Sequence, residues 1–293
     1  MFRGSYTVMV TPFKADGSLD EDQLRKFVDW QIEQGVHGLI PLGSTGEFLS
    51  LTRDERHSVA AIVVEQARKR VPVIVGTAAE WTDEACELSR DAQALGADGV
   101  MVVPPYYSSP TEDEIFEHYR RIGESVSIPV MVYNNPNTAN VDIKPNLIAR
   151  LTQIDTVLYI KESSGSVNRI TRIMDLCGDR MTVFAGYDAW ESFRCGAQGC
   201  VSVLGNIAPA LASDLFNTTV NDQRLEPGYA LYRRLLPLFD ALSGDLYVGA
   251  TKAALRLTGM PVGHPRPPRL PIPENRLAHL KSVLGELGLL ART

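Results

Sequence analysis

The chain has 293 residues, a length that suits two average domains or one large α/β barrel. Its net charge of −6 argues against nucleic acid or an acidic membrane as a partner. No apolar run approaches the ~18 residues that a membrane-spanning helix needs, and the N-terminus lacks the apolar segment of a secretory signal. We therefore expect a cytoplasmic protein that binds neither nucleic acid nor membrane.

Apolar, β-branched runs alternate with helical patterns along most of the chain. Ser18, Thr52 and Thr111 each begin a capping-box pattern, and Thr82 and Ser166 are further predicted helix starts. The first four starts lie about 30 residues apart, which is the period of a repeated βα unit. The predicted strands span residues 6–10, 38–42, 73–76, 99–103, 129–133, 157–161, 182–185 and 200–203.

Eight such units predict an α/β fold of the (β/α)₈ TIM-barrel type. A doubly wound open sheet is the alternative, but it would want a glycine-rich dinucleotide turn after the first strand, and none is present. Three helical segments follow the last strand, at 226–243, 246–258 and 274–290, with a proline-rich link between the last two. We expect a catalytic barrel over residues 1–223 and a small C-terminal helical region over 224–293.

One predicted strand, Val157 to Lys161, ends in a lysine. A short apolar run of this kind is typical of a strand that is buried on both faces. Burial lowers the pKa of a lysine, and a neutral amine can attack a carbonyl carbon to form a Schiff base. In the alternative interpretation, Lys161 lies just past the strand end, in water and paired with Glu162.

The sequence does not contain the residue patterns that several other kinds of catalytic site require. None of the five histidines follows a predicted strand, which argues against a histidine-based triad and against a histidine–carboxylate metal site. No phosphate-binding GxxxxGK[ST] loop is present. The four cysteines form no CxxC pair and are interpreted as reduced structural residues. We expect neither a metal nor a cofactor.

Two further segments stand where barrel enzymes place their working residues, at the C-terminal ends of strands. The turn Gly43–Glu47 (GSTGE) brings backbone N–H groups close together, and a carboxylate suits such a turn. Tyr133 precedes Lys161 by one βα unit, so its phenol would lie near the amine and could transfer protons. The alternatives are a plain connecting turn and a buried core tyrosine.

These residues carry a resemblance to a known family. The segment GLIPLGSTGEF with Glu55, and YNNP (133–136) followed by IKES (160–163), resemble the two signatures of the dihydrodipicolinate synthase / N-acetylneuraminate lyase family of class I aldolases. The likeness extends from about Tyr6 to the C-terminal helices. It implies a TIM barrel that uses no cofactor.

The resemblance also implies roles for individual residues. Lys161 would form a Schiff base with pyruvate or a related 2-oxo acid, whose carboxylate the N–H groups of Ser44 and Thr45 would bind. Tyr133, the Thr45 hydroxyl and Tyr107 would form a proton relay. In the family, this last tyrosine comes from a neighbouring subunit of a homotetramer built as a dimer of dimers. Residues lining the substrate pocket would include Gly186 and Val203.

Departures from the family pattern bear on the second substrate. Thr138 stands where the synthase has an arginine that binds the second substrate's carboxylate, and Tyr187 stands where the synthase has an acidic residue. The positions that match the synthase's lysine-feedback site also differ, and we expect no such feedback. These positions are Leu49, Arg53, Arg56, Glu80 and Glu84.

We expect a Schiff-base lyase that performs aldol or retro-aldol chemistry, or dehydration or deamination of a keto-deoxy acid or cyclic imino acid. The alternative within the family is the synthase reaction itself, the condensation of pyruvate with aspartate semialdehyde. An alternative of another class is a non-catalytic barrel that binds a metabolite.

Overall fold

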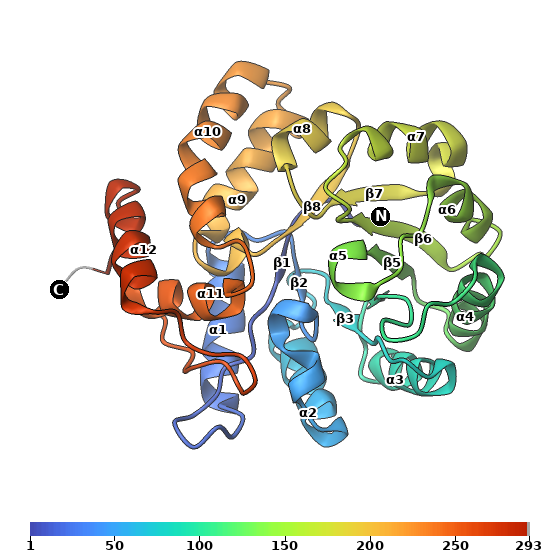
Figure 1. Ribbon diagram of the computed structural model, residues 1–293, viewed down its shortest axis with the longest axis horizontal. Coiled ribbons are helices and arrows are strands. Elements are labelled where there is room, and N and C mark those ends of the chain that lie inside the picture. Colours follow the sequence, from blue (N-terminus) through green and yellow to red (C-terminus); the bar gives the residue numbers. More distant parts are fainter. Residues whose placement is uncertain (292–293) are drawn as a thin grey trace. The chain divides into compact units, whose positions relative to one another are not determined.

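The computed structural model describes residues 1–291, in which strands and helices alternate along the chain (Figure 1). The strands are β1 (Gly4–Val8), β2 (Gly38–Ile40), β3 (Ile74–Gly76), β4 (Gly99–Val102), β5 (Val130–Asn134), β6 (Val157–Glu162), β7 (Thr182–Ala185) and β8 (Gly199–Ser202). The helices are α1 (Glu21–Glu33), α2 (Arg53–Ala67), α3 (Thr82–Ala94), α4 (Glu112–Ser125), α5 (Pro136–Ala139), α6 (Pro145–Leu151), α7 (Asn168–Cys177), α8 (Ala189–Arg194), α9 (Pro209–Phe216), α10 (Leu225–Ala241), α11 (Tyr247–Leu257) and α12 (Glu274–Glu286).

The strands form one sheet in the order β2-β1-β8-β7-β6-β5-β4-β3. Neighbours in this order are consecutive in the chain, except for β1 and β8, which are the first strand and the last. The paired strands run parallel. This is the arrangement of a TIM-like barrel, so the predicted fold class is confirmed. Within residues 1–291, no helix is long and apolar enough to cross a bilayer.

The chain divides into two compact units. The first unit comprises Met1–Gly4 with Pro72–Val201, and the second comprises Ser5–Val71 with Ser202–Thr293. The predicted boundary between residues 223 and 224 stays a prediction. The last two residues of the predicted C-terminal region, 292 and 293, lie outside the described part of the chain.

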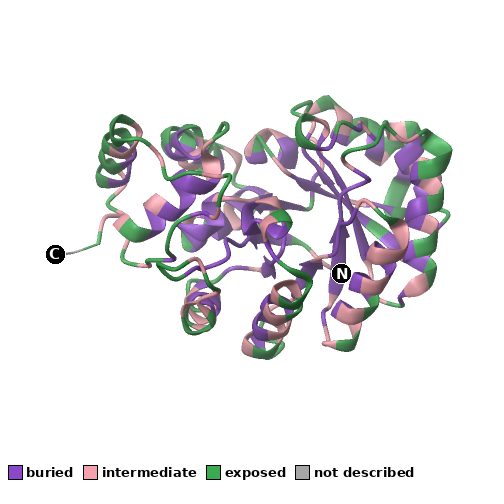
Figure 2. Cartoon of the chain, turned by 60° about the horizontal axis from the view of Figure 1, so that its bottom comes forward, coloured by how far each residue is buried: buried purple, intermediate pink, exposed green. Residues whose placement is uncertain are grey.

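The first unit is built on strands with buried side chains. Every residue of β4 and β5 is buried, and the helices around them expose their outer faces (Figure 2). On α4, the capping box at Thr111 is present as predicted, and Ile115, Tyr119 and Ile122 face the core. The buried Tyr119 hydroxyl donates a hydrogen bond to the Val102 carbonyl at 2.8 Å, which satisfies its polar atom.

In the second unit, one buried position on α1 is polar. Leu24, Phe27 and Val28 are buried, but Gln31 is buried as well. Its amide donates to the Gly205 carbonyl at 2.8 Å and accepts from the Thr7 hydroxyl at 2.7 Å. The amide is tolerated because both of its polar atoms are paired. α10, α11 and α12 belong to this unit, and the proline-rich link before α12 contains no helix or strand.

Two predicted helix starts are wrong, and at a third the start is right but the predicted cap is wrong. The Ser18 hydroxyl donates to Asp16, and Asp20 caps α1 instead, by accepting the Gln23 N–H. α3 does begin at Thr82, but this residue does not cap the helix, and its hydroxyl pairs with His118. α7 begins at Asn168 with no side-chain cap, rather than at Ser166. At Ser18 and Thr82 a nearby side chain or a tertiary partner competes for the hydroxyl that the capping pattern assumes to be free.

Candidate active site

Lys161 and Tyr133 face each other across two neighbouring strands. They are partners in the parallel register of β5 and β6, so their side chains leave the sheet on the same face. Both are buried, with 5% and 6% of their surface exposed. The Lys161 ammonium lies 3.9 Å from the centroid of the Tyr133 ring. The alternative in which Lys161 sits in water beyond the strand end is wrong.

Burial changes the protonation of Lys161. Desolvation lowers the pKa of this lysine from its ordinary value of 10.5 to about 7. A large fraction of the amine is therefore neutral near neutral pH. The neutral amine has the free electron pair that attack on a carbonyl carbon requires.

The Tyr133 phenol has a fixed partner of its own. The Asn135 amide nitrogen lies 2.9 Å from the phenol oxygen, and both side chains are buried. An amide donor at this oxygen fixes the orientation of the hydroxyl. The opposite atom of the same amide, Asn135 Oδ1, is buried and has no hydrogen-bond partner in the described residues.

The residues that follow Tyr133 and Lys161 in the chain brace the other face of the sheet. Asn134 and Glu162 are also register partners, and the Asn134 amide donates to Glu162 at 3.0 Å and accepts the Ile143 N–H at 2.9 Å. Arg169 on α7 donates to Asp142 at 2.7 Å and to the Ile143 carbonyl at 2.7 Å. This network fixes the ends of β5 and β6, and with them the two residues on the opposite face.

The GSTGE turn belongs to the second unit, directly after β2. Thr45 is buried and Ser44 is half-buried. The N–H groups of Gly46 and Glu47 donate to carbonyls within the turn, and those of Ser44 and Thr45 are not used by it. Thr11 stabilises the turn, because its hydroxyl donates to the Gly46 carbonyl at 2.7 Å. Val203, also in this unit, is half-buried in the segment after β8.

Tyr107 lies on the loop after β4 and is 88% exposed. The backbone of this loop is nevertheless held, because the Glu80 carboxylate accepts the N–H groups of Tyr106, Tyr107 and Ser108 at 2.7 to 2.9 Å. These hydrogen bonds lower the pKa of Glu80, although its burial acts most strongly in the opposite direction. Sequence reasoning missed this function of Glu80, since the partners are far apart in the chain.

The other predicted substrate-binding residues of the first unit follow β5 and β7. Thr138 is exposed on α5, and its hydroxyl lies 3.5 Å from the Asn135 carbonyl. The Gly186 N–H donates to the Glu162 carbonyl at 2.8 Å, and a Cβ at this position would collide with the Ser163 hydroxyl. Tyr187 is half-exposed, and desolvation, together with the charge of the nearby Tyr133, raises the pKa of its phenol.

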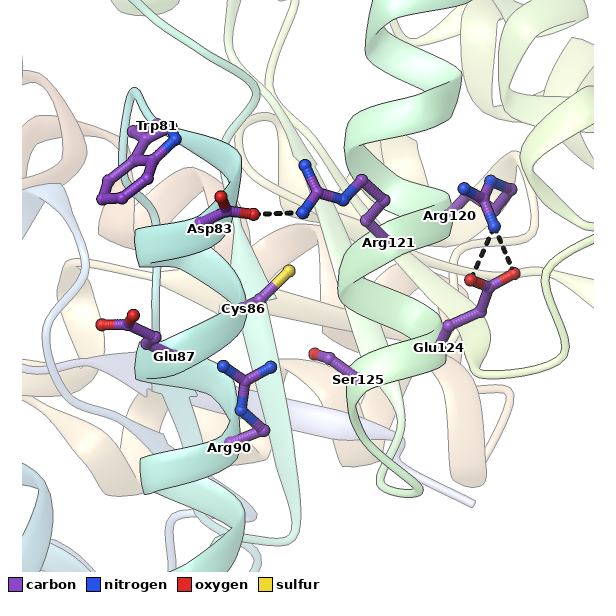
Figure 3. A pocket seen from close by; sticks show the side chains of 9 residues that line it. All are labelled: Trp81, Asp83, Cys86, Glu87, Arg90, Arg120, Arg121, Glu124 and Ser125. Atoms are coloured by element: carbon purple, nitrogen blue, oxygen red, sulfur yellow. Dashed lines mark hydrogen bonds and ion pairs between the residues drawn. The ribbon is translucent and has the colours of Figure 1, made fainter.

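A surface groove of about 490 Å³ between α3 and α4 is separate from these residues (Figure 3). Charged side chains line it, and several of them pair with each other. Arg121 pairs with Asp83, and Arg120 binds Glu124 at 2.6 Å. Because these charges neutralise one another locally, the groove does not resemble a site built for one charged ligand. In the described residues, no three His, Cys, Asp or Glu side chains are grouped to hold a metal ion.

The family model of the dihydrodipicolinate synthetase family matches residues 1–287. The chain belongs to this family. It is therefore a class I lyase of the lysine Schiff-base type, as its signatures predict.

Proteins of known name and structure are similar over the full length. A 4-hydroxy-tetrahydrodipicolinate synthase of Syntrophobacter fumaroxidans is 40% identical over 99% of this chain and 100% of its own. A chloride-inhibited dihydrodipicolinate synthase of Acinetobacter baumannii, solved with pyruvate, aligns with a TM-score of 0.96 at 34% identity, over 99% of this chain and 100% of its own. A prophage protein of the dihydrodipicolinic acid synthase family from E. coli K12, also solved with pyruvate, aligns with a TM-score of 0.94 at 33% identity, over 99% of both chains.

Proposed function

We propose that the protein condenses pyruvate with aspartate semialdehyde, as a 4-hydroxy-tetrahydrodipicolinate synthase does. The observation that carries the chemistry is the buried Lys161 amine in contact with Tyr133, with a pKa lowered to about 7. The choice of this reaction is supported by relatives of that name that are 37% to 40% identical over nearly the whole chain. It was the alternative, rather than the main expectation, drawn from the sequence.

The reaction begins with the neutral Lys161 amine, which attacks the keto carbon of pyruvate. The nitrogen–carbon bond forms as the carbonyl oxygen takes up a proton from the Tyr133 hydroxyl on the neighbouring strand, and the nitrogen gives up a proton in return. Loss of water from this carbinolamine gives the protonated Schiff base. Removal of a proton from the methyl carbon gives the enamine, which forms the new carbon–carbon bond with the aldehyde. The amino group of the aspartate semialdehyde part then attacks the imine carbon, which closes the ring and expels the Lys161 amine.

The GSTGE turn would bind the pyruvate carboxylate. Its two unused N–H groups, those of Ser44 and Thr45, are donors of the kind that carboxylates accept. The Thr45 hydroxyl would pass protons between Tyr133 and Tyr107. In this proposal Gly186, Tyr187 and Val203 line the pocket. The ring of Tyr107 would come from a second subunit of a homotetramer, which suits its 88% exposure.

A second candidate function rests on Thr138. The synthase has an arginine at this position, whereas Thr138 is exposed and carries no charge. A substrate without a second carboxylate, such as a keto-deoxy sugar acid or a cyclic imino acid, would not need that charge. Cleavage, dehydration or deamination of such an acid would start from the same Schiff base.

Two experiments test the proposal. Borohydride reduction in the presence of pyruvate should attach one pyruvyl group to Lys161, located by peptide mass spectrometry, and Lys161→Ala should abolish the labelling. Label on another lysine would contradict the mechanism. Turnover is then compared in two parallel assays. The first follows the consumption of pyruvate in the presence of aspartate semialdehyde, and the second follows the release of pyruvate, water or ammonia from keto-deoxy and imino acids. The first reaction should be the faster. The reverse order would favour the second candidate, and labelling without any turnover would favour a binding protein.

A further inference from the structure

Two residues at the ends of the GSTGE turn have an unusual backbone conformation. Leu42, just before it, has a φ of 61°, and Glu47, its last residue, has a φ of 57°. Residues with large side chains seldom adopt this left-handed conformation, and it persists only where the surroundings hold it in place. The turn therefore depends on contacts outside itself.

The contacts of Glu47 come from the C-terminal part of the second unit. Its side chain is fully buried, and one carboxylate oxygen lies 2.7 Å from the Lys252 ammonium on α11. That oxygen makes the ion pair but no hydrogen bond of regular geometry. The other oxygen accepts the backbone N–H of Arg266 at 2.8 Å. Both oxygens of one buried carboxylate thus tie the turn to α11 and to the proline-rich link.

Lys252 is as completely enclosed as its partner. Its side chain is 1% exposed, its ammonium donates to the His264 carbonyl at 3.1 Å, and it lies 4.2 Å from the centroid of the Phe13 ring. Burial lowers the pKa of Lys252 to about 8, while the charge of Glu47 opposes that change.

Arg266 extends the contact to the next part of the loop. Its guanidinium binds both carboxylate oxygens of Glu55 at 2.5 and 2.7 Å, and it donates to the carbonyls of Ser50 and Gly17 at 2.9 Å. Since Glu55 also completes the capping box of α2, both ends of residues 47–55 are fixed.

A buried ion pair is a weak source of stability, because removing both charges from water offsets most of their attraction. Such a pair does impose a defined geometry on the groups that carry it. The Lys252–Glu47 pair joins a residue outside the chemistry to the last residue of the turn that would bind the substrate carboxylate.

We propose that Lys252 is a positioning residue: through Glu47, it holds the GSTGE turn in the conformation in which the Ser44 and Thr45 N–H groups bind the carboxylate of the 2-oxo acid. The inference rests on the proposed function, since it assumes that this turn binds that carboxylate. It assigns a role in substrate binding to the C-terminal helical region.

The test uses pyruvate labelling of Lys161 under borohydride, because this readout does not depend on the second substrate. Lys252→Met keeps the apolar stem and removes the charge. We expect the half-saturating pyruvate concentration to rise about 10-fold or more, while the labelling rate at saturation changes less than about 3-fold. Glu47→Gln should act in the same direction, and the double variant should add little to the larger single effect, since both changes break one contact. Lys281→Met, at an exposed position on α12, is the matched control.

Folding is checked by circular dichroism and thermal unfolding. If Lys252→Met alone does not fold, the double variant is used for the measurement, because replacing both charges of a buried pair is tolerated better than replacing one. A folded variant with wild-type half-saturation overturns the inference, as does one that loses only its saturating rate. A wild-type protein that pyruvate does not label overturns the proposed function itself, and this inference with it.

Discussion

The Lys161 amine lies against the face of the Tyr133 ring, 3.9 Å from its centroid, because the two residues are register partners on β5 and β6. Their separation is set by the spacing of hydrogen-bonded strands rather than by flexible side chains. The Asn134–Glu162 contact at the next register position keeps this pairing in place. The proposed nucleophile and the proposed proton carrier are thus held together by two neighbouring strands.

The buried amine should make the stability of the protein depend on pH. The pKa of Lys161 is about 7 in the folded protein and 10.5 in an exposed lysine. Between these values the unfolded chain binds a proton that the folded protein does not, so this residue's contribution to stability rises with pH and is least favourable below pH 7. Lys161→Met should therefore raise the melting temperature most at pH 6, with the difference shrinking towards pH 10.

Thermal unfolding of wild-type and Lys161→Met protein at several pH values checks this prediction. Lys252 also titrates abnormally, but it is present in both proteins and cancels from the difference. Lys281→Met, an exposed substitution, should show no such trend. A melting-temperature difference that stays constant from pH 6 to pH 10 would mean that Lys161 keeps an ordinary pKa.

Thr138→Arg should improve the condensation with aspartate semialdehyde. A guanidinium at this position could form a charge-assisted hydrogen bond with the second carboxylate, worth about 1.5–3 kcal/mol. That corresponds to a rise in kcat/KM of roughly 10- to 150-fold, with pyruvate half-saturation unchanged. Steady-state kinetics with both substrates varied measures it. Asn137→Arg places the same charge one residue earlier and serves as the control; an equal gain there would show a non-specific effect of charge.

Tyr107→Phe should preserve labelling by pyruvate and slow turnover by about 100-fold, the loss expected for a missing proton-transfer group. If the ring acts in a neighbouring subunit, mixing this variant with Lys161→Ala should restore activity, because some hybrid sites then contain both wild-type residues. Subunit exchange is followed with a tagged copy, and Tyr106→Phe is the control. Hybrids that form and remain inactive would show that Tyr107 does not work in trans.

Millimolar lysine should leave the activity unchanged. Glu80 is one of the positions expected to match the family's lysine-feedback site. Its carboxylate already accepts hydrogen bonds from three backbone N–H groups of the Tyr106–Ser108 loop. Releasing it to bind an effector would break those hydrogen bonds. Initial rates measured at fixed pyruvate with increasing lysine test this, with arginine as a control for ionic strength. Saturable inhibition by lysine alone would contradict the prediction.

Local patterns in the sequence were enough to predict the fold class, and they made Lys161 the candidate Schiff-base residue. The period of about 30 residues predicts repeated βα units, and the lysine after an apolar run predicts a Schiff-base residue. The fold class follows from such patterns because hydrophobic periodicity and strand spacing act over a few neighbouring residues, and the role of Lys161 stays a prediction. Family membership follows from the two signature segments for the same reason.

Other features were decided only by the tertiary structure. The sequence left open whether Lys161 lies in water, and its burial by the surrounding strands and helices is what lowers its pKa. Two contacts join residues that are distant in the chain. Glu47 forms an ion pair with Lys252, and the Glu80 carboxylate accepts the Tyr107 N–H. A buried charge or an unpaired N–H takes whichever partner the folded chain brings within hydrogen-bonding distance, and no local pattern records that partner.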